Sequence, residues 1–336
     1  MMNRGDFLKS LAALTSGIML PQSGRAKNSG KGAGTHAGRD RWGKLLPQRK
    51  LGRTGEAVTM MGIGGWHIGG QMSEKEARRT IEAAMEEGVR FFDTAENYQD
   101  GESERRYGKY LTPKYRDEVF LMTKTLARDA EQARRDLEGS LRRLDTGYLD
   151  LWQAHSLQSP EDAEGRLASG VAEVMRQAKE EGKVRHIGFT GHRTPYAHQR
   201  MLGETDFFET VQMPVNVLDP SFMSFIENVL PIAADRNMGV LAMKTLANGR
   251  FFEKKSHGGG AQTAVVPDRI SIRQALNFVW SLPVSTIITG PDNAEMLREN
   301  VQLARDFTEM GDAERQELVA RVADLADGSV QYFKEA

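Results

Sequence analysis

Residues 61–93 read MGIGGWHIGGQMSEKEARRTIEAAMEEGVRFFD, which is a short apolar run, a longer amphipathic segment and a second apolar run. Runs of three or four apolar residues are typical of buried parallel strands, and apolar residues at helical spacing are typical of the helices that cover them. We therefore expect strands at Met61–Gly64 and Phe91–Asp93, joined by a helix at Glu74–Glu87. Such a unit places its two strands parallel and side by side.

The same alternation continues for most of the remaining chain. Six more strand candidates follow, at Val119–Thr123, Tyr148–Ala154, His186–Thr190, Thr210–Met213, Val240–Met243 and Thr286–Thr289. Further helices are expected at Ala130–Leu144, Gly170–Glu181 and Arg269–Ser281. Eight βα units with short connections favour a closed barrel over an open doubly wound sheet. We predict an α/β fold, a (β/α)8 TIM barrel, preceded by a β-hairpin at about Arg49–Met60 with Arg53-Thr54-Gly55 as its turn.

Composition excludes several classes of function. The chain has 336 residues, which is long enough for one barrel of about 250 residues with additions. Its formal net charge is -1 with no dominant block of like charge, so neither nucleic acid nor an anionic membrane is an expected partner. The absence of cysteine excludes disulfides, thiolate metal sites and a cysteine nucleophile. We expect a small-molecule substrate and no metal, and the sequence leaves the oligomeric state open.

The first residues resemble a secretion signal rather than part of a barrel. Asn3 to Lys9 precede an apolar run, Leu11–Leu20, that is too short to span a bilayer, which needs about 20 residues. This stretch resembles a twin-arginine export signal, except that Gly5 occupies the position of the second arginine. We predict a leader and flexible linker over 1–38, with a disordered or amphipathic arm as the alternative, and a single barrel over 39–336. The protein is periplasmic or exported if the leader works, and cytoplasmic otherwise.

Polar side chains gather where the second, third and fourth strands end. Asp93 ends the second strand, with Tyr98 five residues later; Lys124 ends the third and His155 the fourth. The carboxyl ends of barrel strands meet at one rim, so we expect these four to lie together. A phenol has a pKa of about 10, and a nearby ammonium lowers it. The set then supplies a proton donor (Tyr98), its cation (Lys124), a counter-ion (Asp93) and a group that orients a substrate oxygen (His155).

Several ordered motifs resemble those of the aldo-keto reductases. They are Leu51-Gly52-Arg53-Thr54-Gly55, Met61 to Trp66, Phe92-Asp93-Thr94-Ala95-Glu96-Asn97-Tyr98, Met122-Thr123-Lys124-Thr125, Leu151-Trp152-Gln153-Ala154-His155, Gly182 to His192 and Gln212 to Asn216. The resemblance covers about residues 49–305. It implies hydride transfer between a nicotinamide cofactor and a carbonyl or alcohol, with Tyr98 as the general acid-base, Lys124 and Asp93 as the ion pair that tunes it, and His155 as the group that orients the carbonyl.

The resemblance also implies where the cofactor lies. The implied cofactor contacts are Gly65, Thr190, Gln212, Met243, Lys244, Leu246, Gly249, Arg250, Asp292, Met296, Glu299 and Asn300. Glu299 and Asn300 match the adenine contacts, whereas the positions that often carry basic residues in NADPH-preferring members are not basic here. Asp292 would repel a 2′-phosphate, and Arg298 is the residue that could compensate. NADP(H), the usual cofactor of the family, is favoured over NAD(H), which the residues themselves suggest.

The substrate is the least defined part of the interpretation. Trp66, His67 and His192 are the candidate substrate contacts, and aldehydes, ketones and open-chain sugars are all compatible with them. The long segment Leu246–Asp268, with Gly258-Gly259-Gly260, is either a clasp over a ligand or a surface insertion. Two other functions remain: a nicotinamide-binding sensor or partner subunit, and a barrel hydrolase or isomerase that uses Asp93 and His155 with a metal.

Overall fold

The computed structural model describes residues 38–252, 254–255, 261–262, 266 and 268–335. The predicted leader lies outside the described residues except for Gly38, and so does the glycine triplet Gly258–Gly260.

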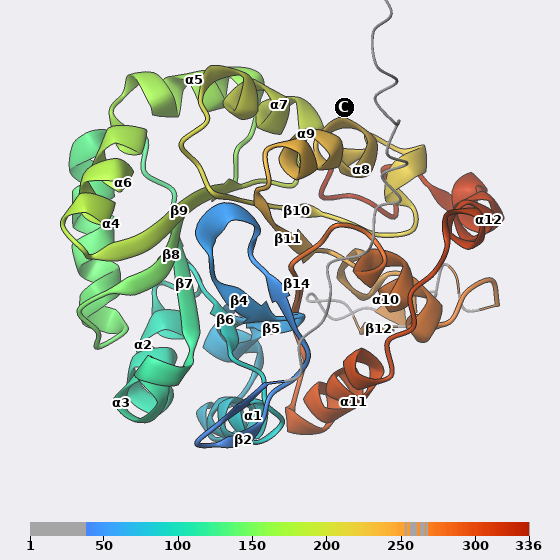
Figure 1. Cartoon of the computed structure of the whole chain (residues 1–336), viewed down its shortest axis with the longest axis horizontal. Helices are drawn as coiled ribbons and strands as arrows, with labels where there is room; N and C mark the ends of the chain where they lie inside the picture. The colour runs from blue at the N-terminus through green and yellow to red at the C-terminus, as the bar shows by residue number, and fades with distance from the viewer. Residues whose placement is uncertain (1–37, 253, 256–260, 263–265, 267, 336) are drawn as a thin grey trace, which may run out of the picture. The chain divides into compact units, whose positions relative to one another are not determined.

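Eight parallel strands close into a barrel, which confirms the predicted fold (Figure 1). They are β5 (Met61–Gly64), β6 (Phe91–Asp93), β7 (Phe120–Thr125), β8 (Leu149–Ala154), β9 (Val184–Thr190), β10 (Thr210–Pro214), β11 (Gly239–Met243) and β14 (Thr286–Thr289). Around the barrel their order is β10-β11-β14-β5-β6-β7-β8-β9, so the sheet is joined where β14 pairs with β5 and β9 with β10. Every predicted strand is present, and its ends shift by at most two residues.

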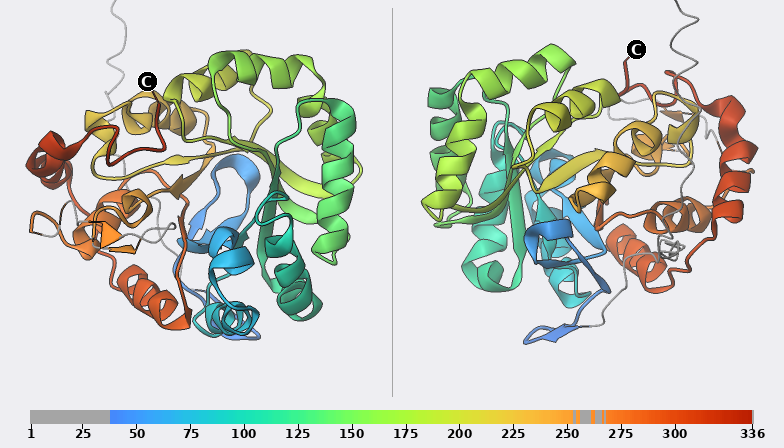
Figure 2. Two further views of the ribbon diagram at one scale, coloured as in Figure 1. Left: turned by 180° about the vertical axis from the view of Figure 1, so that it is seen from behind. Right: turned by 45° about the horizontal axis from the view of Figure 1, so that its top comes forward.

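Helices cover the outside of the barrel in both views of Figure 2. They are α1 (Glu74–Glu86), α2 (Glu102–Tyr110), α3 (Thr112–Tyr115), α4 (Ala130–Arg143), α5 (Pro160–Ala168), α6 (Val171–Glu180), α7 (Pro195–Glu204), α8 (Phe225–Asn228), α9 (Leu230–Asp235), α10 (Ile272–Trp280), α11 (Ala294–Arg305) and α12 (Asp312–Val322). α1 begins where the Ser73 hydroxyl accepts the Glu76 backbone N–H at 3.2 Å, which satisfies one donor of the first turn. The four helices predicted from amphipathic spacing are all present.

The predicted hairpin consists of β3 (Gln48–Lys50) and β4 (Ala57–Thr59), and it covers the amino-terminal end of the barrel. The backbone N–H of Arg53 donates to the Asn237 carbonyl at 2.6 Å, just before β11 begins. Gly52, at φ +52°, lies so close that a Cβ there would be 2.3 Å from the Gly239 nitrogen. The structure adds a shorter hairpin, β1 (Arg39–Asp40) with β2 (Gly43–Lys44), that the sequence did not predict.

Alternate residues of each strand face opposite sides, as strand geometry requires. In β6, Phe91 belongs to a small buried cluster with Leu51 and Val58 of the hairpin region. Its neighbour Phe92 belongs to the large outer core and packs edge-on against Tyr107 of α2. Asp93 follows on the Phe91 side, so the periodicity of the strand alone directs its carboxylate to the barrel interior near the rim.

No helix in the described part of the chain is long and apolar enough to cross a membrane.

Candidate active site

Lys124 lies at the centre of the predicted site, and the structure brings Asp93, Tyr98 and Lys124 together. Its ammonium forms an ion pair with Asp93 and donates to the Tyr98 hydroxyl at 3.2 Å and to the Thr94 carbonyl at 2.7 Å. Lys124 is 1% exposed and Asp93 3%. The three side chains come from β7, β6 and the turn after β6, which the parallel pairing of these strands places side by side.

Electrostatics in this group differ in one respect from the expectation. Burial lowers the pKa of Lys124, but the charges of Asp93 and Tyr98 and the hydrogen bonds outweigh burial, so its net pKa is raised and the ammonium stays charged. Burial raises the pKa of Tyr98, and Lys124 only partly opposes the rise. The predicted net lowering of the phenol pKa is therefore wrong, because removal from water has the larger effect. The phenol keeps its proton at neutral pH, as a proton donor must.

His155 completes the predicted set of four. Its ring lies edge-on to that of Tyr98, with centroids 5.8 Å apart, and its backbone N–H donates to the Thr125 carbonyl at 2.8 Å. Burial, followed by the Lys124 charge, holds the pKa of His155 well below 6.5. A neutral imidazole carries one N–H donor, which is what orienting a substrate oxygen needs. On the other side of Tyr98, the ring of Trp66 packs edge-on at 5.2 Å and is 42% exposed.

Three predicted cofactor contacts lie next to this group. Gln212 of β10 donates to Asp93 at 3.4 Å, and its amide oxygen is buried without a hydrogen-bond partner. Thr190, at the end of β9, pairs with Gln212 in the barrel sheet and is buried. Gly65 follows β5, and its carbonyl accepts the Ser103 hydroxyl at 2.8 Å. An unsatisfied buried oxygen is costly unless a donor reaches it, so the amide of Gln212 fits a ligand that carries an N–H group, such as a carboxamide.

Five more of the predicted cofactor contacts are Met243, the last residue of β11, and Lys244, Leu246, Gly249 and Arg250 in the loop that follows this strand. Three non-glycine residues in it have left-handed backbone, Lys244 at φ 58°, Ala247 at 47° and Asn248 at 59°. Few side chains adopt this conformation, and where they do the surrounding structure must hold them there. Neighbouring residues must therefore hold this loop in its conformation at the rim.

The loop after β14 and the first half of α11 hold the remaining predicted cofactor contacts. The Asp292 backbone N–H contacts the Met296 sulfur at 3.4 Å, Asn300 donates to the Thr289 hydroxyl at 3.1 Å, and Glu299 is exposed. His67 packs against Gly290, where a Cβ would lie 2.4 Å from its ring, and its Nε2 is 3.7 Å from an Asp292 oxygen. This predicted substrate contact thus lies among the predicted cofactor contacts.

Arg298 does not face the loop after β14. Its guanidinium lies 3.5 Å from a carboxylate oxygen of Glu86 and 3.7 Å from one of Glu87, both at the end of α1. The residue that could have compensated for Asp292 near a 2′-phosphate is therefore engaged elsewhere.

Sequence reasoning missed two features of the rim. Glu96 is largely buried: its Oε1 accepts the Leu126 N–H at 2.8 Å, its Oε2 has no hydrogen-bond partner, and burial raises its pKa to about 7. His192, predicted to contact substrate, bonds the Phe333 carbonyl at 2.9 Å, from a segment 141 positions further along the chain. No local pattern predicts either feature, since each depends on which loops meet.

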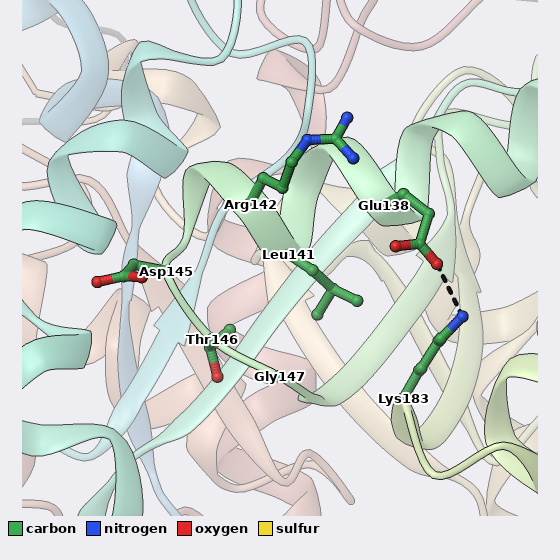
Figure 3. Close-up of a pocket in the computed structure, with 7 residues that line it drawn as sticks. All are labelled: Glu138, Leu141, Arg142, Asp145, Thr146, Gly147 and Lys183. Atoms are coloured by element: carbon green, nitrogen blue, oxygen red, sulfur yellow. Dashed lines mark hydrogen bonds and ion pairs between the residues drawn. The ribbon is translucent and has the colours of Figure 1, made fainter.

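A surface hollow lies at the opposite, amino-terminal ends of the strands, and Figure 3 shows the residues that line it. Its lining comes from the end of α4, the turn before β8 and Lys183, which pairs with Glu138 at 2.7 Å. In TIM barrels the chemistry lies at the carboxyl ends of strands, and the amino ends serve stability. The candidate active site is therefore the Lys124 rim rather than the hollow. Within the described residues, no group of three or more carboxylate and histidine side chains is arranged to hold a metal ion.

A closed barrel with a buried lysine, an aspartate and a tyrosine at its carboxyl rim is the architecture of a barrel oxidoreductase. A profile of the aldo/keto reductase family matches residues 60–309. The chain belongs to the aldo/keto reductase family and is an NAD(P)-dependent oxidoreductase.

Individual relatives agree with this assignment. The chain is 34% identical over 216 residues to aldo-keto reductase YhdN of Bacillus subtilis, a match that covers 58% of this chain and 61% of that protein. It is 25% identical over 301 residues to L-galactose dehydrogenase of Arabidopsis thaliana, covering 78% and 89% of the two chains. The holo form of aldo-keto reductase AKR11C1 from Bacillus halodurans superposes with a TM-score of 0.70 at 23% identity, covering 84% of this chain and 99% of that one, which supports the fold.

Proposed function

We propose that the protein interconverts a carbonyl compound and an alcohol, with Tyr98 as the proton donor in the direction of reduction. The observation that carries the proposal is the Lys124 ammonium, which contacts both the Asp93 carboxylate and the Tyr98 hydroxyl inside the rim. When the phenol gives up its proton, negative charge develops on an oxygen that already accepts a hydrogen bond from a cation. Electrostatic stabilisation of that kind needs no rearrangement during the reaction.

Each of the four side chains has a distinct task in this proposal. Tyr98 holds its proton at neutral pH, because burial raises its pKa, and releases it to the substrate oxygen. Asp93 keeps Lys124 charged and in place. His155, neutral at physiological pH, donates a hydrogen bond that fixes the direction of the substrate oxygen. The edge-on contact of Trp66 with Tyr98 makes it a wall of the substrate site.

A nicotinamide cofactor supplies the hydride, and the residues present fit such a group. The unsatisfied amide oxygen of Gln212 is positioned to accept from its carboxamide, beside Thr190. The loop Lys244–Arg250 contributes two cationic side chains for a pyrophosphate. Asp292 and Asn300 follow β14, and in TIM barrels the loops after the seventh and eighth strands commonly bind phosphate groups.

The charged residues near β14 bear on whether NAD(H) or NADP(H) binds. The sequence favoured NADP(H) through the resemblance, and the structure adds that Arg298 pairs with Glu86 and Glu87 of α1. Arg298 is the only basic residue between 289 and 300. Asp292 is exposed, so its carboxylate would repel a 2′-phosphate or accept a hydrogen bond from a ribose hydroxyl. We expect NAD(H) to bind at least as tightly as NADP(H), which competitive titration of both forms measures. The substrate class remains aldehydes, ketones and open-chain sugars.

Substitution of Tyr98 by Phe tests the mechanism. This variant removes one oxygen and leaves the ion pair of Lys124 with Asp93 intact. We expect turnover of an aldehyde panel to fall about 10²- to 10⁴-fold, with the Kd for the cofactor unchanged. Tyr196→Phe is the matched control, because Tyr196 is 56% exposed on α7. Wild-type turnover in Tyr98→Phe contradicts the mechanism, and tight cofactor binding without turnover in the wild type favours the sensor or partner-subunit alternative.

A further inference from the structure

The segment Asp327–Glu335, which we call the return segment, is fixed to the barrel rim by a buried ion pair. The Lys334 ammonium lies 2.5 Å from a carboxylate oxygen of Asp219, and both side chains are 0% exposed. Lys334 also donates to the Phe222 carbonyl at 2.8 Å. Asp219 in turn accepts the Ser224 hydroxyl at 2.9 Å and the Ile226 N–H at 2.8 Å. A buried charge pair is tolerated only when such partners satisfy it, so this position of the segment is specific.

The same segment contacts the loop after β11. Asn248 donates to the Tyr332 hydroxyl, and the Arg250 guanidinium lies 5.3 Å from the centroid of the Tyr332 ring. The Lys244 ammonium lies 5.7 Å from the centroid of the Phe333 ring. Both cationic side chains of the loop therefore rest on aromatic rings of the return segment.

The backbone of that loop needs external support. Lys244, Ala247 and Asn248 have left-handed backbone, which the chain adopts only where neighbours hold it. Asn216 links the loop to the return segment, because its side-chain amide donates to both the Lys244 carbonyl and the Gln331 amide oxygen at 3.3 Å. The strained loop and the return segment are thus joined by side-chain and backbone contacts alike.

The return segment also reaches the loop after β9. The Phe333 carbonyl bonds His192 at 2.9 Å, and the Glu335 N–H donates to the Arg193 carbonyl at 2.8 Å. In Figures 1 and 2 the red end of the chain runs from α12 back to the side of α8. It therefore bridges the loops after β9, β10 and β11, which carry or adjoin the contacts proposed for the nicotinamide and the pyrophosphate.

We propose that the return segment positions the loop Lys244–Arg250 for the cofactor, so that cofactor affinity is coupled to the Lys334–Asp219 anchor. This inference rests on the proposed function, because it assumes that the loop contacts the cofactor. Lys334 touches neither substrate nor cofactor in this proposal and acts as a positioning residue. Coupling between two sites is reciprocal, so bound cofactor must in turn stabilise the return segment.

The test compares full-length variants in cofactor binding. Lys334→Met keeps the length of the side chain and removes its charge, and Tyr332→Ala removes an exposed ring while leaving the anchor intact. Nicotinamide fluorescence gives the Kd for NADH and NADPH, and stopped-flow displacement gives the dissociation rate. We expect Lys334→Met to raise the Kd about 5- to 150-fold, the usual range for coupled sites. The increase should lie mainly in the dissociation rate, kcat at saturating cofactor should not fall, and Tyr332→Ala should act in the same direction with a smaller effect.

Lys183→Met is the matched control, since Lys183 forms an exposed pair with Glu138 at the other end of the barrel, and its Kd should equal that of the wild type. Hydrogen exchange of the wild type tests the converse, with slower exchange of residues 330–335 expected when cofactor is bound. This measurement and Tyr332→Ala remain decisive if Lys334→Met does not fold. Wild-type affinity and dissociation rate in the folded variants, or exchange unaffected by cofactor, overturns the inference. A wild-type protein that binds neither cofactor instead overturns the proposed function.

Discussion

At the scale of single residues, burial competes with charge in setting the protonation states at the rim. Lys124 keeps its proton because the charges of Asp93 and Tyr98 outweigh the cost of burial. Tyr98 keeps its proton because burial outweighs the charge of Lys124. For Glu96, burial and the nearby carboxylates of Asp136 and Glu104 act in the same direction and raise its pKa to about 7. The sequence predicted which residues meet and what Lys124 does to its neighbour. It did not predict the net pKa of Tyr98, because the degree of burial depends on how Trp66 and the surrounding loops pack.

Glu96 gives a prediction about stability and pH. Its pKa is raised from 4.5 to about 7 in the folded protein. The folded state therefore binds a proton that the unfolded state has already lost, and the free energy of unfolding falls as pH rises from about 4.5 to 7. The full effect is on the order of 3 kcal/mol. Glu96→Gln keeps an oxygen that accepts the Leu126 N–H, and it replaces the carboxyl group with an amide that does not ionise.

Urea unfolding between pH 4 and 8.5 measures this effect. We expect the stability of Glu96→Gln relative to the wild type to rise across the window from pH 4.5 to 7 and to stay constant above it. A difference that does not change with pH would show that Glu96 titrates normally in the folded protein.

At the scale of elements, the alternation of apolar runs and amphipathic segments predicted all eight strands and the hairpin. The pattern is strong because each strand, such as Phe91–Asp93, is buried on both sides, and each helix exposes one face. The hairpin β1–β2 and the return segment escaped prediction, since their residues have no periodicity. No sequence pattern marks Lys334 as buried, and only the fold shows that it lies against Asp219.

The hairpin offers a prediction about two neighbouring glycines. Gly52 at φ +52° and Gly55 at φ +83° both have left-handed backbone, but a Cβ at Gly52 would lie 2.3 Å from the backbone of β11, whereas one at Gly55 meets nothing within 4 Å. Gly55→Ala should lower the free energy of unfolding only by the cost of left-handed backbone at alanine, roughly 1–2 kcal/mol. Gly52→Ala should lower the free energy of unfolding by about 1–3 kcal/mol more than Gly55→Ala does, because the added methyl group forces the hairpin away from β11. Denaturant midpoints of the two variants measure the difference, and equal midpoints would mean that the hairpin does not press on the barrel.

At the scale of the whole molecule, we propose that residues 39–336 form one folding unit and that residues 1–38 are a leader and linker. A chain that begins at Gly38 should then unfold at the same temperature as the full chain, to within about 2 °C, and bind cofactor with the same Kd. Calorimetry and fluorescence titration of the two proteins measure this. A drop in either quantity would assign residues 1–38 to the barrel or its site.

The site could be predicted from sequence to the extent that parallel strands deliver their ends to one rim. Asp93, Tyr98, Lys124 and His155 follow from that rule alone. The location of His67 beside Asp292 does not, because it depends on the closure of the barrel between β14 and β5. The orientation of Arg298 towards α1 likewise required the packed structure, since its position on α11 allowed either direction.

The hairpin at the amino-terminal end has a kinetic consequence. Because β3 and β4 cover that end, the side chains proposed for the reaction face the opposite rim. In the proposed function, cofactor and substrate therefore enter by the same opening. We expect the one that lies deeper to bind first and to leave last, so that the order of addition follows from the shape of the barrel.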